Sequence, residues 1–287
     1  MKDMASDKER LDTLLVERGL FPSREKAKAA IMAGLVWIGQ ERVDKAGMKV
    51  PRDAAVTVKG APHPYVSRGG LKLEKAIRTF AIAMDGRIVI DIGASTGGFT
   101  DCALRHGAAM VYAIDVGYNQ LDWSLRQDKR VRVMERTNFR LMTPDRLDGP
   151  PPDMAVIDVS FISLRLILPV LANILQPGGE TVALVKPQFE AGREQVGKSG
   201  VVRDPAVHRQ VLATVLASAH SLGFRLQGLT WSPITGGEGN IEFLAYWRFE
   251  PSESGEGEHA GAEDGRTWEE TIRSVVAEAH AHFANNA

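Results

Sequence analysis

The sequence has a single cysteine, Cys102, and no long uninterrupted apolar run in its 287 residues. One cysteine cannot close an internal disulfide, and the chain offers no cysteine pair for a structural zinc ion or an iron–sulfur cluster. The most apolar stretch, residues 161–175, is interrupted by Arg165 and Asn173, and no basic segment followed by an apolar one opens the chain. We therefore expect a metal-free protein of the reducing cytoplasm that neither carries an export signal nor spans a membrane.

Charge is balanced overall but unevenly distributed along the chain. The 35 basic and 36 acidic side chains give a net charge of −1, and 44% hydrophobic with 25% charged residues is an ordinary globular composition. Residues 1–72 carry 14 basic against 9 acidic side chains, whereas residues 250–287 carry 2 against 9. A basic beginning is typical of nucleic-acid binding but also of an ordinary lysine-rich surface, so charge alone leaves both interpretations open.

The first 60 residues are predicted to form a small α+β domain. Apolar residues at helical spacing run from Leu11 to a stop at Gly19, and Ser23 is placed to cap a second helix. Strands are expected at residues 35–38 and 56–58. Prolines at positions 62 and 64 hold the chain extended, so residues 61–66 are the expected linker after a domain of residues 8–60.

Several short motifs of this segment match a known module. They are Arg10-Leu11-Asp12, Ser23-Arg24 followed by alanines, and Gly34-Leu35-Val36 with Gly39 and Val43 beyond. The segment resembles the S-four-type RNA-binding module found in a ribosomal protein, pseudouridine synthases and tyrosyl-tRNA synthetases. The resemblance implies contacts to the phosphates of folded RNA. The candidate RNA-binding residues are Arg10, Arg24, Lys26 and Lys28, with Arg68 at the start of the next domain.

From residue 87 onward, short apolar strands alternate with helical stretches. The predicted strands are residues 87–92, 110–114, 131–134, 154–159, 181–185, 225–231 and 241–247. The first five predict a parallel sheet, and the last two, joined by a loop, predict an antiparallel pair at one edge. The expected fold class is α/β, a Rossmann-like domain over residues 67–250 with a seven-stranded, mostly parallel sheet. The expected acidic tail, residues 251–287, is flexible over 251–265 and ends in a helix.

A glycine-rich turn, Asp91-Ile-Gly-Ala-Ser-Thr-Gly-Gly-Phe-Thr100, follows the first of these strands and leads into a helix. It lacks the Lys-Ser/Thr of a Walker phosphate loop and the Gly-x-Gly-x-x-Gly of a dinucleotide loop. Residues 93–97 match the nucleophile elbow of hydrolases, but His208 and His220, its candidate bases, fall within a predicted apolar helix. A tight turn with no ligand is a further alternative.

An S-adenosylmethionine site is the interpretation that we favour for this turn. Asp115 ends the next strand, 24 positions after Asp91. Its carboxylate would accept both ribose hydroxyls, while the backbone of the glycine-rich turn packs against the methionine part of the cofactor.

Four charged residues are predicted to meet at the carboxyl edge of the sheet. Asp158 and Lys186 end the fourth and fifth strands. Glu242 begins the last strand, and Lys72 lies in the helix that enters the domain. Singly, each is an ordinary surface charge. Together their charges sum to zero, which lets four ionisable groups share a partly buried site.

The four residues and the motifs around them resemble a known enzyme family. The motifs are Ser67 to Leu73, Asp91 to Thr100, Asp115 to Tyr118, Gln120 to Arg126, Glu135 to Asn138, Asp158 to Leu164, Leu184 to Glu190 and Gly239 to Glu242. The four charged residues match the Lys-Asp-Lys-Glu set of FtsJ/RrmJ-type ribose 2'-O-methyltransferases. The motifs resemble those of the TlyA family, bacterial ribosomal RNA cytidine 2'-O-methyltransferases that also carry the name haemolysin. The resemblance covers roughly residues 8–249.

The resemblance implies S-adenosyl-L-methionine as the cofactor and a cytidine of 16S or 23S ribosomal RNA, in the ribosomal subunits, as the substrate. It implies four catalytic residues, Lys72, Asp158, Lys186 and Glu242. The implied cofactor-binding residues are Asp91, Gly93, Ala94, Ser95, Thr96, Gly97, Gly98, Phe99, Thr100, Asp115, Val116, Thr137 and Asn138. Two alternatives stay open: methylation of another RNA, and a membrane-active haemolysin-like protein, for which we find no strongly basic amphipathic segment.

The role of Lys186 has two interpretations. A neutral ribose hydroxyl is a weak nucleophile, so its proton must leave. Lys186 can accept that proton only if burial and Lys72 favour its neutral form, whereas Asp158 and Glu242 favour the charged form. Alternatively, Lys186 is a cation that lowers the pKa of the hydroxyl and holds its oxygen in line, oriented by Asp158.

Overall fold

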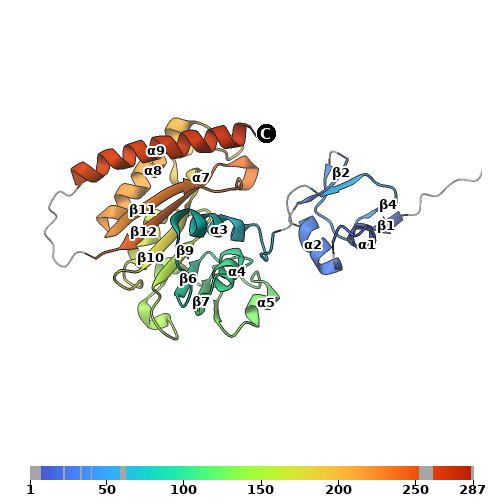
Figure 1. The fold of residues 1–287 in the computed structure, drawn as a ribbon, viewed down its shortest axis with the longest axis horizontal. Coiled ribbons are helices and arrows are strands. Elements are labelled where there is room, and N and C mark those ends of the chain that lie inside the picture. The colour runs from blue at the N-terminus through green and yellow to red at the C-terminus, as the bar shows by residue number, and fades with distance from the viewer. Residues whose placement is uncertain are drawn as a thin grey trace, which may run out of the picture. The chain divides into compact units, whose positions relative to one another are not determined.

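The computed structural model describes residues 8–21, 23–32, 34–39, 41–58, 63–251 and 261–285 (Figure 1). The chain separates into two compact units, residues 1–64 and 65–287. Each unit has a hydrophobic core of its own, so the two are described in turn.

Over its described residues, the N-terminal unit consists of two helices and two small antiparallel sheets. Its elements are β1 (Lys8–Arg10), α1 (Leu11–Glu17), α2 (Arg24–Met32), β2 (Val36–Ile38), β3 (Glu41–Arg42), β4 (Lys49–Pro51) and β5 (Val56–Val58). The sheets have the orders β1-β4 and β3-β2-β5. Both predicted helices are confirmed, and the Ser23 hydroxyl accepts a hydrogen bond from the Lys26 amide at 3.3 Å at the start of α2.

The larger unit is built on a seven-stranded sheet. Its strands are β6 (Ile88–Ile92), β7 (Met110–Ile114), β8 (Val131–Met134), β9 (Met154–Ile157), β10 (Glu180–Val185), β11 (Phe224–Trp231) and β12 (Phe243–Phe249). The order is β11-β12-β10-β9-β6-β7-β8, parallel from β10 to β8, with β12 antiparallel to both of its neighbours. The predicted Rossmann-like sheet with an antiparallel last pair is confirmed.

The last strand begins two residues later than the sequence predicts. Backbone pairing of β12 with β10 starts at Phe243, opposite Val185. Val185 is the last residue of β10, because Pro187 then opens a helix and has no amide hydrogen for a ladder. The prediction that Glu242 begins the strand is therefore wrong: this residue lies just before the strand, and its carbonyl accepts a hydrogen bond from the Ser232 amide at 2.8 Å.

Helices cover both faces of the sheet (Figure 1). On one face, α3 (Gly69–Phe80) and α4 (Gly98–Arg105) pack on the buried residues of the first core layer. On the other, α6 (Leu168–Leu171) and α8 (Pro205–Ser221) pack on the second. The remaining short helices are α5 (Trp123–Arg126), α7 (Pro187–Glu190) and the 3-10 turns η1 (Phe139–Leu141), η2 (Pro144–Arg146), η3 (Leu164–Leu166), η4 (Arg193–Gln195) and η5 (Gly237–Gly239).

The C-terminal helix predicted from the sequence is α9 (Gly261–Ala284). It lies beside α8 and β11 and contributes Ile272, Val275 and Val276 to the second core layer (Figure 1). Of the segment expected to be flexible, residues 252–260 lie outside the described residues, whereas residues 261–265 already belong to α9. The helix is thus an integral part of the larger unit.

Candidate active site

Three strand ends place charged side chains on one face of the sheet. Side chains alternate between the faces of a strand, and the even-numbered residues of β9, β10 and β12 belong to the core layer under α3 and α4. Asp158, Lys186 and Glu242 continue this even-numbered alternation just beyond the strands. Because β12 is antiparallel, its beginning lies at the same edge as the ends of β9 and β10. Lys72 comes from α3, the helix that packs on this face of the sheet.

The four predicted charged residues form two ion pairs at this edge. Lys72 Nζ lies 2.6 Å from Glu242 Oε2, and Lys186 Nζ lies 2.6 Å from Asp158 Oδ1. Lys186 and Glu242 follow and precede the paired residues Val185 and Phe243, so they are neighbours across β10 and β12. The structure therefore brings all four side chains into one cluster.

The cluster is largely withdrawn from water. Lys72 and Lys186 are each 8% exposed and Glu242 is 2% exposed, whereas the side chain of Asp158 remains 21% exposed. Two cations and two anions leave no unpaired charge in this environment, which keeps the cost of burying the ions low. Because Asp158 is the most exposed of the four, its pair with Lys186 is the more open of the two.

Ser160, which contacts the cluster of four charged residues, was not predicted as a site residue from the sequence. Lys186 Nζ also donates a hydrogen bond to Ser160 Oγ at 2.9 Å. In the parallel pairing of β9 and β10, residues 26 positions apart are opposite each other, which places residue 160 beside residue 186. This register would have predicted the contact between Ser160 and Lys186. It can be used only once β9 and β10 are known to be neighbours.

The glycine-rich turn after β6 has an unusual backbone. Gly93, Ser95 and Gly97 have positive φ angles of 87°, 48° and 94°, in the left-handed region that glycine adopts most easily. At Gly97 an added Cβ would also lie 2.2 Å from a side-chain atom of Leu125. The turn exposes Ser95 and Thr96, while its other predicted residues, Ala94, Gly97, Gly98, Phe99 and Thr100, are buried beneath them.

Asp115, at the end of β7, holds this turn through its carboxylate. Its Oδ2 accepts a hydrogen bond from the Ser95 amide at 2.8 Å, and its Oδ1 accepts one from the Gly117 amide at 2.6 Å. An ionised carboxylate has about four acceptor sites, so two remain for a pair of hydroxyl groups. These remaining acceptor sites therefore fit a ribose with two free hydroxyls.

Asp91 supports the turn from below. It is completely buried, because its side chain points from β6 toward α4, where Thr100 Oγ1 donates a hydrogen bond to Asp91 Oδ2 at 2.6 Å. Burial raises the pKa of Asp91 to about 7, although the Thr100 hydrogen bond opposes this effect. Among the described residues, the other oxygen, Oδ1, has no hydrogen-bond partner.

The remaining predicted cofactor residues lie around the end of β7. Val116 is 72% exposed and directly follows Asp115. The Thr137 amide donates to the Asp115 carbonyl at 2.9 Å, and Asn138 is exposed and caps η1 by accepting from the Arg140 amide at 3.1 Å. Thr137 thus fixes the backbone that carries Asp115, while Val116 and Asn138 offer side chains to solvent.

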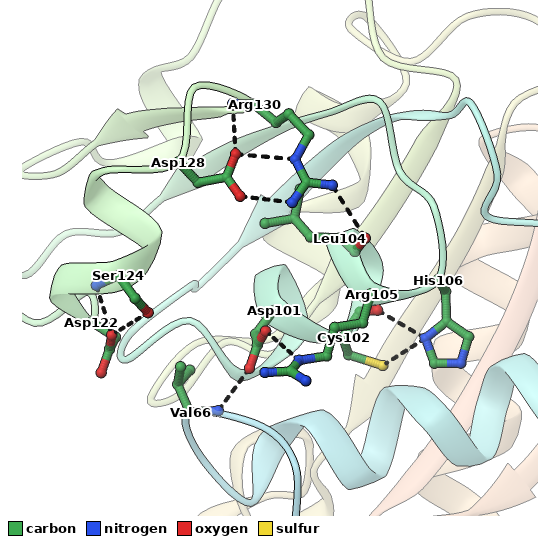
Figure 2. A network of polar contacts seen from close by, with 10 residues as sticks. All are labelled: Val66, Asp101, Cys102, Leu104, Arg105, His106, Asp122, Ser124, Asp128 and Arg130. Carbon is green, nitrogen blue, oxygen red and sulfur yellow. Dashed lines mark hydrogen bonds and ion pairs between the residues drawn. The ribbon is translucent and has the colours of Figure 1, made fainter. Parts of the chain in front are cut away.

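Helix α4, which begins at the turn, is fixed by polar contacts (Figure 2). Asp101 accepts a hydrogen bond from the Val66 amide at 2.9 Å and pairs with Arg105 at 2.7 Å. At its far end, the Leu104 carbonyl accepts from Arg130, which also pairs with Asp128. These contacts connect the turn to the segment that enters α3 and to the beginning of β8.

The predicted RNA-binding residues do not have equivalent surroundings. Arg10 and Arg24 each contact Asp12 at 3.0 Å, and these guanidinium groups, Arg10 first, lower the pKa of Asp12 to about 2. Lys26 and Lys28 are exposed on α2 with no ion pair to any described residue, and Arg68 is exposed before α3. Two of the five predicted side chains therefore also hold α1 and α2 together.

The hydrolase alternative is not supported by the positions of its histidines. His208 is fully buried, its Nε2 donates a hydrogen bond to the Val202 carbonyl at 3.1 Å, and its Nδ1 lies 2.9 Å from His280 Nε2. His220 contacts Arg225. Both are thus engaged away from Ser95. Within the described residues, no three His, Cys, Asp or Glu side chains are grouped to hold a metal ion, and no helix is long and apolar enough to cross a bilayer.

Comparison with known proteins identifies two families. Residues 65–249 match the FtsJ-like methyltransferase family, and residues 9–56 match the S4 domain. A candidate rRNA methyltransferase of Bacillus subtilis, YqxC, is 59% identical over 277 residues, which cover 96% of each chain. The 16S/23S rRNA (cytidine-2'-O)-methyltransferase TlyA of Mycobacterium tuberculosis is 46% identical over 83% of this chain and 89% of its own.

A solved structure agrees over almost the whole length. A candidate hemolysin from Streptococcus thermophilus has 52% sequence identity and a TM-score of 0.74, and the match covers 98% of this chain and 99% of that one. The chain belongs to the TlyA family, in which an S4 domain precedes an FtsJ-like methyltransferase domain that uses S-adenosylmethionine as its cofactor.

Proposed function

We propose that the protein methylates the ribose 2'-hydroxyl of a cytidine in 16S or 23S ribosomal RNA, within the ribosomal subunits. The observation that carries this proposal is the cluster of Lys72, Asp158, Lys186 and Glu242, which lies at the same sheet edge as the turn held by Asp115. The name of the Mycobacterium tuberculosis relative supports the cytidine and the ribosomal RNA. An enzyme with this substrate works in the cytoplasm.

The cofactor supplies an electrophilic methyl group on its sulfonium. Asp115 would hold the ribose hydroxyls of the cofactor through its two remaining acceptor sites, and the backbone of residues 93–97 would hold the methionine part. The free Oδ1 of Asp91 suits an ammonium group, which would hold this carboxyl in its charged form. Val116 would offer apolar contact to the adenine base of the cofactor, and Asn138 would offer this base a hydrogen bond.

Lys186 acts on the acceptor hydroxyl. The 2.6 Å contact with Asp158 and the hydrogen bond to Ser160 fix its ammonium group in one direction. A cation held in this way stabilises negative charge that develops on the 2'-oxygen and orients this oxygen for in-line attack. This arrangement supports the orienting cation over a neutral lysine base, and Lys72 with Glu242 balances the charge behind it. The hydroxyl proton then passes to solvent water as the 2'-oxygen gains the methyl group and the bond between that methyl group and the sulfonium sulfur breaks.

The experiment that tests the proposal compares Lys186→Ala with the parent protein. Ribosomal RNA from cells that lack the protein is incubated with tritiated S-adenosylmethionine, and single-turnover methyl transfer is measured. We expect the rate to fall on the order of 10²-fold or more, because the variant lacks the group placed at the nucleophile. Equilibrium binding of RNA and cofactor should remain near that of the parent.

Lys129→Ala is the matched control, because Lys129 is an exposed lysine of the same unit away from the cluster. Its rate should match the parent within about threefold, as for most surface substitutions. If Lys186→Ala keeps more than about a tenth of the parental rate, the catalytic role of Lys186 is refuted, because losing a group that stabilises developing charge usually costs on the order of 10²-fold or more. Mass mapping of the product RNA must place the methyl group on a cytidine ribose.

A further inference from the structure

The loop between β11 and β12 closes tightly over the carboxylate of Glu242. A Cβ added to Gly236 would lie 2.1 Å from Glu242 Oε1 and 2.6 Å from its Cδ, far inside van der Waals contact. The φ angle of Gly236 is −74°, which any residue adopts easily. The site therefore requires glycine for space beside the carboxylate and not for backbone freedom.

Asn240 fixes this loop in place. It is only 3% exposed, and its Oδ1 accepts a hydrogen bond from the Val202 amide at 3.1 Å. Its Nδ2 donates to the carbonyls of Gly200 and Gly237, both at 3.0 Å, so both donors of the amide are used. Its own carbonyl accepts from the Gly236 amide at 2.9 Å. Asn240 thus ties the backbone of Gly236 to a second, separate loop.

We infer that Gly236 and Asn240 are positioning residues that set the Glu242 carboxylate against Lys72. The carboxylate is confined between Lys72 Nζ, 2.6 Å away, and the backbone of Gly236. Because Glu242 is only 2% exposed, water cannot solvate its carboxylate if the carboxylate is moved away from Lys72. A carboxylate moved away from Lys72 leaves a buried ammonium without its partner and disturbs the charge balance behind Lys186. This inference rests on the proposed function of the four-residue cluster.

The substitution Gly236→Ala tests the inference directly. The end of the Glu242 side chain can rotate away from the added methyl group, so the variant is expected to fold. The carboxylate is then misplaced, and single-turnover methyl transfer to ribosomal RNA from cells lacking the protein should fall by about tenfold to 10²-fold. Dissociation constants for RNA and S-adenosylmethionine should stay unchanged. Gly237→Ala is the matched control, because its added Cβ would meet no atom within 4 Å.

A double-mutant cycle separates positioning from a general structural role. Glu242→Ala removes the carboxylate that the Cβ added at position 236 would displace. In the Glu242→Ala background, Gly236→Ala should therefore cause no further loss of rate. Equal losses in both backgrounds, or a parental rate in Gly236→Ala, overturn the inference. Asn240→Ala should likewise lower the rate with intact Glu242 and leave both dissociation constants unchanged.

The two proposals fail in different ways. If Glu242→Ala itself keeps the parental rate, the role of Glu242 in the proposed function is wrong, and the inference falls with it. If Glu242→Ala loses the rate but Gly236→Ala does not, only the positioning role is wrong.

Discussion

At the scale of single residues, Asp115 performs two tasks with one carboxylate. It accepts hydrogen bonds from the amides of Ser95 and Gly117, and it keeps acceptor sites free at the end of β7. An amide side chain has the same shape but carries no charge and presents a donor nitrogen where Asp115 has an oxygen. The residue is therefore sensitive to a substitution that hardly changes its volume.

We predict that Asp115→Asn weakens S-adenosylmethionine binding by about tenfold or more, the usual loss when a charge-assisted hydrogen bond is removed. Isothermal titration calorimetry measures the change. Asp145→Asn, an exposed carboxylate of the same unit, is the control and should bind as the parent does. Parental affinity in folded Asp115→Asn contradicts the assignment of the ribose site.

At the scale of elements, α8 and α9 meet across two imidazole rings. His208 Nδ1 and His280 Nε2 lie 2.9 Å apart. Burial, and then the neighbouring His280, lower the pKa of His208 to about 4 from its ordinary value near 6.5. The hydrogen bond to the Val202 carbonyl and then the charge of Asp204 raise the pKa of His208, and burial also lowers the pKa of His280.

This lowered pKa predicts a pH-dependent stability. The unfolded chain binds a proton at His208 below about pH 6.5, whereas the folded protein resists it down to about pH 4. Stability contributed by the neutral pair is thus present above pH 6.5 and lost as the pH falls toward 4. His208→Gln cannot titrate, so its thermal midpoint should fall less than that of the parent over this range. Parallel curves in differential scanning calorimetry would show that the pair does not titrate as described.

The sequence predicts the parallel strands well because each is an apolar run bounded by glycine or polar residues. It misplaces the start of β12, because residues 241–242 continue the alternation of a strand. The pairing partner of β12 decides where the strand begins: β10 ends at Val185, which lies opposite Phe243. Strand β1 was missed, since Lys8–Arg10 is wholly charged and is held by backbone pairing with β4. Such pairings are nonlocal and leave no periodic signal.

The same limit applies to the candidate site. Strand alternation places Asp158 and Lys186 on one face, so their convergence could be expected from sequence. The meeting of Lys72 with Glu242, 170 positions away, was expected from the resemblance to the Lys-Asp-Lys-Glu set, but which of the two carboxylates pairs with Lys72 depends on the fold. Gly236 also has no sequence signal, since its φ is ordinary and its importance lies in a single close approach.

At the scale of the whole molecule, the S4 domain and the methyltransferase domain are separate units with separate cores. Lys26 and Lys28 project from α2 of the smaller unit, whereas Arg24 also holds Asp12. Substituting the two lysines therefore tests RNA contacts without disturbing the domain, whereas substituting Arg24 would also weaken the contact between α1 and α2.

We predict that Lys26→Ala with Lys28→Ala lowers RNA affinity and makes its dependence on salt less steep by about one unit of slope for each lost phosphate contact. S-adenosylmethionine affinity should not change. Filter binding of ribosomal RNA over a salt series measures the slope, and Lys26→Arg with Lys28→Arg, which keeps both charges, should match the parent. An unchanged slope in the alanine variant excludes these lysines from the RNA contact.

The antiparallel direction of β12 also sets the order in which the site becomes complete during synthesis. Lys72, Asp158 and Lys186 all leave the ribosome before Glu242, which comes 56 positions after Lys186. A nascent chain that ends just after Lys186, the residue that follows β10, has the pair of Lys186 and Asp158 but lacks the carboxylate for Lys72. Domains fold as their residues emerge, so the charge balance of the cluster is reached only after β11 and its loop have been added. The methyltransferase domain therefore gains its complete set of charges only when the segment that leads into its last strand, β12, has been made.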